Sequence, residues 1–378
     1  MKITKLLLIF TIVLISCTND SNNSEESNNN SNFQEPEYVM LIPEATPISS
    51  IVLDDNIQIV YAESNFTYKI SQVNSNGFIE WTRDLELLDD FIEFSLFKKI
   101  GSVLYFIYQQ NDGLKFIELD INGSVTNNGV ISNTRYNRLQ ANSDKFYAMK
   151  YESNNVIINS YTYTGNFIET NNITTNIYAT HNCKVLIKND LSYVFGQENF
   201  IANNPFFYEN FYCEIYNSSL ELLGDFNINL SNKIGNEQLA LVLNNGNILT
   251  KNYNGNINKT QIEIFDSNGN LLFDNSFNER HGASRILEDN NGNLRLILKN
   301  ASAIPNEKNM RLITLTQNLE VVSERRLGSD SDVGDNVKEI IETNEFIYLI
   351  GGTAGTDGDF DIPNNSHTDD LFIFKLEK

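Results

Sequence analysis

The chain has few of the residues that most metal and redox sites need. Its 378 residues include only three cysteines and three histidines (His181, His281 and His367), which leaves little for a zinc, haem or iron–sulfur site. Basic residues are also scarce, with 27 Lys and Arg against 49 Asp and Glu and a formal net charge of −22. Because nucleic-acid binding relies on Lys and Arg contacts to phosphate, this balance argues against a nucleic-acid partner. Hydrophobic residues make up 41% of the chain, which is enough to build a core.

The N-terminus has the pattern of a secretory signal. Lys2 and Lys5 precede an apolar run, Leu6–Ile15, which is too short to cross about 30 Å of hydrocarbon as a helix and is typical of a signal peptide. The run ends in Leu14–Cys17 (LISC), which resembles the lipobox of bacterial lipoproteins. The resemblance implies cleavage before Cys17 and acylation, including palmitate, at Cys17. The alternative is an ordinary secretory signal with a chance cysteine.

A polar tether is predicted over residues 18–36. Its first fifteen residues, TNDSNNSEESNNNSN, contain nothing that can be buried, so we expect a disordered connection between lipid and domain. Residue 18 is Thr rather than Asp. By resemblance to lipoproteins of Gram-negative bacteria, this implies the outer membrane rather than retention in the inner membrane. Asp20, Glu25 and Glu26 resemble the surface-export signals of some outer-membrane lipoproteins.

The rest of the chain, residues 37–378, is a repeat with a period of about 42 to 54 residues. Each unit contains an apolar-alternating strand, a tight turn and a second strand, and several turns contain Asn-Gly, as at Asn76-Gly77, Asn122-Gly123 and Asn268-Gly269. Asn-Gly is typical of a two-residue type I′ hairpin turn. A second hairpin precedes each of these, so each unit is predicted to have four antiparallel strands. No segment shows a long helical period.

Four-stranded units repeated radially make an all-β β-propeller. We count seven units and therefore predict seven blades, with six or eight as alternatives. The seventh unit, ending in LFIFKLEK (371–378), lacks a fourth strand, and EYVMLIPEA (37–45) is a strand without a unit. We expect the two to pair and close the ring, which would remove the exposed sheet edges. A pair of β-sandwiches would not explain the regular period.

The last unit also carries a family resemblance. GGTAGTDGDFDIPNNSHTDDLFIFKLEK (351–378) is similar to a G-x-T-x-S-x-D-G-D…D-x-W-hydrophobic-x-K-L-D repeat of secreted bacterial propeller proteins. Phe372 stands at the tryptophan position and Glu377 at the final Asp, and the matching residues are Gly352, Thr353, Asp357, Gly358, Asp359, Asp370, Lys375 and Leu376. The resemblance implies a secreted propeller.

Function is expected on the face that carries the long loops. These are the predicted connections between second and third strands, at 197–208, 301–309 and 353–370, and long loops on a rigid scaffold commonly bind ligands. Carboxylates spaced two residues apart can surround Ca²⁺, which takes six to eight oxygen ligands. The candidate calcium ligands are Asp330, Asp332, Asp335, Asp357, Asp359 and Asp361. The alternative is a pair of solvated loops in which Asp caps turns.

No catalytic motif is evident. His281 or His367 could act as a general base, but a surface histidine is the simpler interpretation. The sequence therefore favours a lipid-anchored binding module of the cell envelope, with an envelope protein or a glycan as partner. The alternatives are a carbohydrate hydrolase or lyase that uses carboxylates about 5–10 Å apart at the mouth of the central channel, and a purely structural role. Cys183 and Cys213 are expected on the first and third strands of the fourth unit, too far apart for a disulfide, and so to be free thiols.

Overall fold

The computed structural model describes eleven segments of the chain, which together form 28 strands and one short 3-10 helix. The described residues are 36–64, 66–87, 91–177, 183–196, 210–229, 239–254, 259–278, 283–299, 308–330, 335–361 and 370–378. Within these segments no helix is long and apolar enough to cross a membrane.

The strands form seven separate sheets, each with four antiparallel strands. Blade 1 consists of β2 (Ala45–Leu53), β3 (Asn56–Glu63), β4 (Tyr68–Val73) and β5 (Ile79–Leu85). Blade 2 consists of β6 (Phe94–Ile100), β7 (Val103–Gln110), β8 (Gly113–Leu119) and β9 (Val125–Ser132). Blade 3 consists of β10 (Arg138–Ala141), β11 (Phe146–Glu152), β12 (Asn155–Tyr161) and β13 (Phe167–Thr174). Blade 4 consists of β14 (Lys184–Lys188), β15 (Leu191–Gly196), β16 (Asn210–Tyr216) and β17 (Leu222–Asn229). Blade 5 consists of β18 (Leu239–Val242), β19 (Ile248–Asn254), β20 (Lys259–Phe265) and β21 (Leu271–Phe277). Blade 6 consists of β22 (Ala283–Glu288), β23 (Leu294–Lys299), β24 (Met310–Leu315) and β25 (Val321–Leu327). Blade 7 consists of β26 (Asn336–Glu342), β27 (Phe346–Thr353), β28 (Asp370–Glu377) and β1 (Tyr38–Ile42). The 3-10 helix η1 (Gly358–Phe360) lies between β27 and β28 in the chain.

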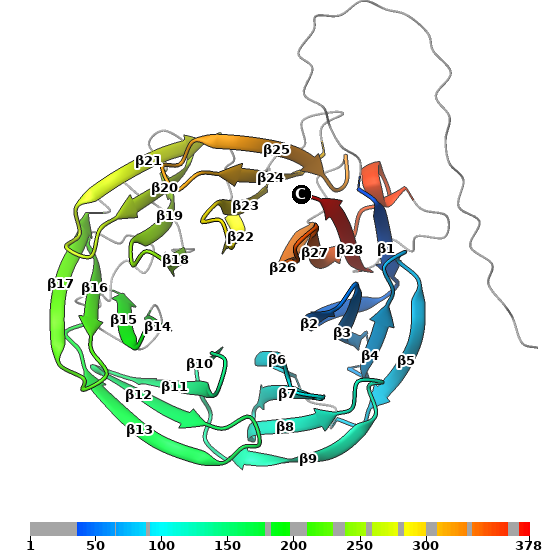
Figure 1. Cartoon of the computed structure of the whole chain (residues 1–378), viewed down its shortest axis with the longest axis horizontal. Coiled ribbons are helices and arrows are strands. Elements are labelled where there is room, and N and C mark those ends of the chain that lie inside the picture. Colours follow the sequence, from blue (N-terminus) through cyan, green and yellow to red (C-terminus); the bar gives the residue numbers. More distant parts are fainter. Residues whose placement is uncertain are drawn as a thin grey trace, which may run out of the picture. The chain divides into compact units, whose positions relative to one another are not determined.

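The seven sheets stand around a ring, with the first strand of each blade nearest the centre and the fourth outermost (Figure 1). This confirms the seven-bladed β-propeller and excludes the alternatives of six or eight blades. We call β2, β6, β10, β14, β18, β22 and β26 the inner ring. All seven begin after a connection from the preceding blade, so their first residues share one face. We call it the loop face, and the opposite face the tight-turn face.

The position of a strand within its blade explains its composition. The second strand β7 (VLYFIYQQ) is almost wholly buried, because sheets of neighbouring blades cover both of its faces. The outermost strand β13 (FIETNNIT) is mostly exposed and polar. Seven clusters of buried apolar residues form the core, and one of them joins Tyr68 and Ile70 of blade 1 to Leu104 and Phe106 of blade 2.

The tight turns differ from the predicted type. In blade 1 the Asn74 amide donates to the Phe78 carbonyl and the Gly77 amide donates to the Asn74 carbonyl, so the loop has three residues, 75–77. Only Gly77 has positive φ, at +82°. The turn is therefore a type I turn followed by a left-handed residue, and the two-residue type I′ prediction was wrong. The Asn74 side chain selects this form, because its Oδ1 accepts the amides of Asn76 and Phe78.

The N-terminal strand closes the ring as predicted. β1 pairs with β28 in antiparallel register from Tyr38↔Lys375 to Ile42↔Leu371 and supplies the fourth strand of blade 7. The predicted strand 37–45 is divided, since β1 ends at Ile42 and β2 begins at Ala45. Lys375 Nζ also donates to the Ser75 carbonyl of blade 1 at 3.1 Å, so the last strand of the chain is bonded to both neighbouring strands and to the first blade.

Two cysteines of the described residues, Cys183 and Cys213, belong to blade 4, and both are free thiols, as expected. Cys183 directly precedes β14 and Cys213 lies on β16, with β15 between these two strands. Burial raises the pKa of the Cys183 thiol to about 12 and holds the pKa of Cys213 well above its ordinary value. Neither thiol is therefore activated as a nucleophile.

Candidate functional site

The loop face carries the three long connections named from the sequence. They join β15 to β16, β23 to β24 and β27 to β28, which are second and third strands of blades 4, 6 and 7. Most of their residues lie outside the described part of the chain; the described ones are Lys308, Asn309, 353–361 and Asp370. His181, His281 and His367 also lie outside it, so the structure gives no geometry for a histidine base.

Blade 7 and the connection that leads into it bring four of the six candidate calcium ligands together at this face: Asp330, Asp335, Asp357 and Asp359. The carboxylate of Asp335 is fully buried and accepts three hydrogen bonds. Its Oδ2 accepts from the Ser329 amide at 2.8 Å and the Ser329 hydroxyl at 2.9 Å, and its Oδ1 accepts from the Thr353 hydroxyl at 2.5 Å. Asp335 thus fastens the connection from blade 6 to the end of β27.

The Asp357–Asp359 segment pairs with the same connection. Asp357 Oδ1 accepts the Asp330 amide at 3.1 Å, and Asp359 Oδ2 accepts the Gly328 amide at 2.9 Å. Lys308 Nζ lies 2.5 Å from Asp359 Oδ1. These N–H donors occupy carboxylate oxygens that a cation would otherwise bind.

The calcium site stays a prediction. Asp361 is exposed just after η1, and Asp332 lies outside the described residues. Among the residues that the structure places, no group of three or more His, Cys, Asp or Glu is arranged to hold a metal. Calorimetric titration of Ca²⁺ into the protein and into its Asp357→Ala/Asp359→Ala variant tests the site. Saturable heat that the variant loses would establish it, and no heat would leave these carboxylates as hydrogen-bond acceptors.

Gly358 gives this acidic turn its shape and provides a testable prediction. Its φ is +60°, and a Cβ there would lie 2.5 Å from the Gly328 carbonyl oxygen and 3.0 Å from the Asp330 amide nitrogen. We expect Gly358→Ala to lower the free energy of unfolding by about 2–3 kcal/mol, because both the backbone conformation and the close approach are lost. Denaturant unfolding measures this difference.

Gly101 is the matched control, because it has the same φ of +60° and no atom lies within 4 Å of the position that a Cβ would take there. Gly101→Ala should lower the free energy of unfolding by only about 1 kcal/mol, because the left-handed backbone conformation is its one unfavourable feature. Equal losses for the two variants would show that the contact between Gly358 and blade 6 contributes nothing.

Polar side chains link the strands of the inner ring across the blade junctions. Gln140 of β10 makes two hydrogen bonds with the backbone of Ile187 on β14, at 2.5 and 3.0 Å. Lys188 Nζ of β14 donates to the Val242 carbonyl of β18 at 2.7 Å and lies 3.5 Å from Glu288 Oε2 of β22. Similar links join Lys184 to the Ala240 carbonyl, Arg285 to the Lys338 carbonyl and Ser50 to Glu339.

Three basic side chains lie toward the loop-face end of the inner-ring strands. Arg138 and Lys184 are the first residues of β10 and β14, and Arg285 is the third residue of β22. Burial, together with the positive charges of Arg138 and Arg285, lowers the pKa of Lys184 to about 7. Lys184 is therefore within electrostatic reach of both Arg138 and Arg285.

One carboxylate of the inner ring lies in the same region. Glu339, the fourth residue of β26, is bonded by the Ser50 and Ser49 hydroxyls, and burial raises its pKa. The other two inner-ring carboxylates in the described chain, Glu288 and Glu342, end their strands at the tight-turn face. Glu339 is thus the one carboxylate of the described inner-ring strands that does not lie at the tight-turn end of its strand.

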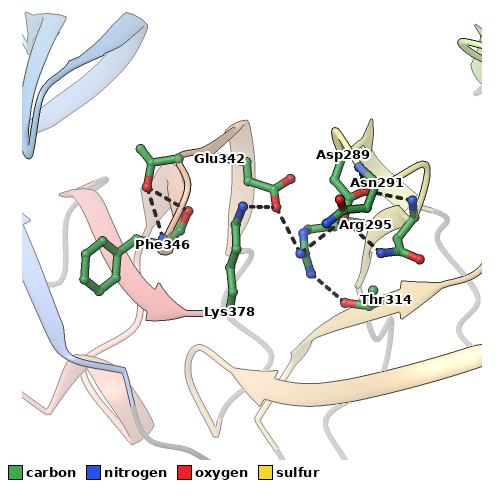
Figure 2. Close-up of polar contacts among 9 residues, drawn as sticks. Asp289, Asn291, Arg295, Thr314, Glu342, Phe346 and Lys378 are labelled. Carbon is green, nitrogen blue, oxygen red and sulfur yellow. Dashed lines mark hydrogen bonds and ion pairs between the residues drawn. The ribbon is translucent and has the colours of Figure 1, made fainter.

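A buried ion-pair network at the tight-turn face joins blades 6 and 7 (Figure 2). Arg295 Nη2 lies 3.0 Å from Glu342 Oε1 and 3.4 Å from Asp289 Oδ2, and Arg295 Nη1 donates to the Thr314 hydroxyl at 2.9 Å. Lys378 Nζ lies 2.6 Å from Glu342 Oε1. Because these charges face one another inside the protein, the network fastens the last two blades.

Comparison with known proteins identifies the architecture. No family model and no curated protein matches the chain. Among solved structures, it is similar to a chain in the crystal structure of a mitotic checkpoint complex, with a TM-score of 0.55, 10% identity and coverage of 97% of this chain and 99% of that one. The likeness is one of fold alone. The β-propeller domain of the Trilobed protease from Pyrococcus furiosus, which has an open velcro topology, is similar at a TM-score of 0.50 and 10% identity over 91% of this chain and 96% of that one. The present chain differs from it in its β1–β28 closure.

Sequence reasoning missed the basic cluster on the inner ring. Its residues lie on blades 3, 4 and 6, and no spacing in the chain relates Arg138, Lys184 and Arg285. A signal was nonetheless present, because strands such as KVLIK (184–188) begin and end with lysine in a strongly acidic chain. Comparing the charge of the first strand across all seven units would have found it.

Proposed function

We propose that this protein is a lipid-anchored binding module of the cell envelope, which holds an envelope protein or a glycan at its loop face. The observation that carries the proposal is the combination of Cys17 at the end of an apolar run, an Asn- and Ser-rich tether and a closed propeller. A ring with its first and last strands paired is a rigid platform for binding loops. The outer membrane of a Gram-negative bacterium is the expected location, with Cys17 acylation as the anchor.

Replacement of Cys17 by Ser tests the anchor. In a bacterial host fed a clickable palmitate analogue, the unchanged chain should be labelled and should sediment with membranes. Cys17→Ser should lose both label and sedimentation. Cys213→Ser is the matched control, because Cys213 is fully buried and its loss should leave the label unchanged. Labelling of the Cys17→Ser variant would refute lipidation at Cys17.

Site-specific crosslinking tests the binding face. A photo-crosslinking residue placed at exposed Lys338, on the inner ring near the loop face, should capture a partner in intact cells. The same residue at exposed Asn76, in a tight turn, should capture less of it. Preferential capture at Asn76 would place binding on the opposite face and contradict the proposal.

A further inference from the structure

The tight-turn face has an apolar outer edge. In six blades, large apolar side chains are exposed in the tight turn or at the start of the fourth strand: Phe78 and Ile79; Ile121 and Val125; Phe167 and Ile168; Leu222 and Leu223; Leu271 and Leu272; and Val321 and Val322. We call these residues the apolar rim. They are twelve of the seventeen large apolar side chains that are exposed in the described part of the chain. Exposed apolar residues that are scattered singly are normal, but a position that repeats from blade to blade indicates a binding surface.

The apolar rim is confined to one end of the fourth strands, which form the outermost wall of the ring (Figure 1). In β13, Phe167 and Ile168 are followed by the polar residues ETNN (169–172), and in β25, Val321 and Val322 are followed by SERR (323–326). These outer strands are therefore apolar at the tight-turn face and polar beyond it. A surface that contacts the whole rim must approach the propeller from the tight-turn face.

The chain enters the propeller at the same edge. The Glu37 amide donates to the Lys375 carbonyl at 2.9 Å, and Tyr38 pairs with Lys375 near the end of β28. As the third strand of its blade, β28 ends at the tight-turn face. The half-buried Tyr38 and Val39 hold in blade 7 the position that the rim residues hold in the other blades. Residues 18–36 therefore connect Cys17 to the tight-turn face, and nineteen residues span at most about 65 Å.

The turns that bear the rim carry no basic charge. The turns at 74–77, 120–123, 162–165, 217–220, 266–269 and 316–319 contain no Lys or Arg and two acids, Asp120 and Asp266. Each of these carboxylates accepts backbone amides of its own turn. Attraction to anionic lipid is therefore not available to the rim, whereas burial of its apolar side chains among uncharged head groups is.

We propose that the tight-turn face rests on the lipid bilayer, with the apolar rim inserted among the head groups and the loop face directed away from the membrane. The inference rests on the proposed Cys17 anchor, which would keep the propeller within reach of the bilayer, and it adds an orientation that the anchor alone does not give. Tethering makes the local concentration of lipid high, so many weak contacts suffice. The long connections of the loop face stay accessible to a partner.

Quenching of tryptophan fluorescence by brominated lipid tests which face meets the bilayer. Trp81 is the one tryptophan of the chain, so Trp81→Phe provides a background for single-tryptophan variants. Val322 of the rim and Val130, near the loop-face end of β9, both lie on fourth strands and are 58% and 59% exposed. The full-length chain, acylated in a bacterial host, is reconstituted in vesicles of brominated or ordinary phosphatidylcholine.

The bromine atoms should quench Val322→Trp at least by half and Val130→Trp by less than a tenth. Equal quenching at the two positions, or stronger quenching at position 130, would overturn the proposal. Quenching of Val322→Trp that appears only when anionic phosphatidylglycerol is added would overturn it too, because the turns of the rim offer no charge that attracts this lipid.

Charged substitutions test whether the rim acts as a unit. In the Val322→Trp chain, Leu271→Asp/Leu272→Asp should reduce the quenching at least twofold, because carboxylates resist burial among lipids. Phe94→Asp/Val130→Asp is the matched control, since it places the same charges on exposed residues toward the loop face, and it should leave the quenching unchanged. Equal effects of the two double substitutions would mean that only overall charge matters, and the proposal would be wrong.

Flotation with vesicles reports on the anchor, whereas quenching reports on the rim. A chain that floats with vesicles without quenching of Val322→Trp would keep the proposed anchor and lose this inference. A chain that does not float would refute the anchor and this inference with it. Emission of Val322→Trp that shifts to the blue with rising protein concentration, without vesicles, would show that the rim binds a second copy of the chain and would also overturn the proposal.

Discussion

A chain that begins at Glu44, and so lacks β1, is expected to lose most of its stability and to aggregate. Met40 and Ile42 of β1 are buried, and they pack with Leu371 and Ile373 of β28. Burial of each such side chain contributes about 1.5–3 kcal/mol, and the truncation also exposes the edge of β28, whose residues 370–376 are all buried. The expected loss is about 5 kcal/mol or more, which is comparable with the total stability of many domains. Size-exclusion chromatography and denaturant unfolding measure it.

A chain that begins at Gln34 is the control, because it retains Glu37 and all of β1. It should remain monodisperse and unfold at the same denaturant concentration as the full-length chain. A synthetic peptide of residues 36–43, added in trans, should recover part of the lost stability by restoring the five-residue β1–β28 pairing. Equal midpoints for the two truncated chains would show that β1 is not required for closure.

Arg295→Met is expected to destabilise the protein far more than the loss of a surface ion pair would. The Arg295 side chain is only 10% exposed, and its partners Asp289 and Glu342 are 1% and 8% exposed. Removal of one member of a buried ion pair costs about 3–5 kcal/mol. We expect about 3 kcal/mol, because Lys378 still neutralises Glu342 and the amides of Asn291 and Asn293 still bind Asp289. Denaturant unfolding of the variant gives the value.

Arg311→Met, on β24 of the same blade, is the matched control. Arg311 pairs with Glu324 at the protein surface, with side chains 20% and 33% exposed, and such pairs contribute about 1 kcal/mol or less. The double variant Arg295→Met/Glu342→Met should recover part of the loss, because it removes a buried carboxylate as well. A double variant less stable than Arg295→Met would contradict the view that unpaired charge causes the destabilisation.

The sequence predicted the fold well because the propeller repeats a local pattern. Tight turns recur in every complete unit, so the third and fourth strands could be placed from alternation alone. The closure by β1 followed from counting strands at the two ends of the chain. The turn type was wrong because Asn-Gly suits both forms, and the hydrogen bonds of the Asn74 side chain, three residues before Gly77, select the three-residue loop.

The candidate site was harder to predict, because its residues come from different blades. The acidic segments around Asp330 and Asp357 were named as candidate calcium ligands, and the Asp330 amide does donate to Asp357. The sequence could not show which groups bind these carboxylate oxygens. Lys308 and the Gly328 amide contact Asp359 only because the folded chain brings them together. The Arg138, Lys184 and Arg285 cluster likewise exists only because the ring brings blades 3, 4 and 6 around one axis.

The pairing of β1 with β28 also sets an order of events in folding. Blades 1 to 6 are continuous in the chain, and each can form from its own residues. Blade 7 needs both ends, and the Glu44 amide bonds to Asp370 across 326 residues. Because contacts between distant residues form slowly, we expect β1 to pair after blades 1 to 6 have formed. The apolar segment YVMLI (38–42) would therefore stay unpaired until β28 is available.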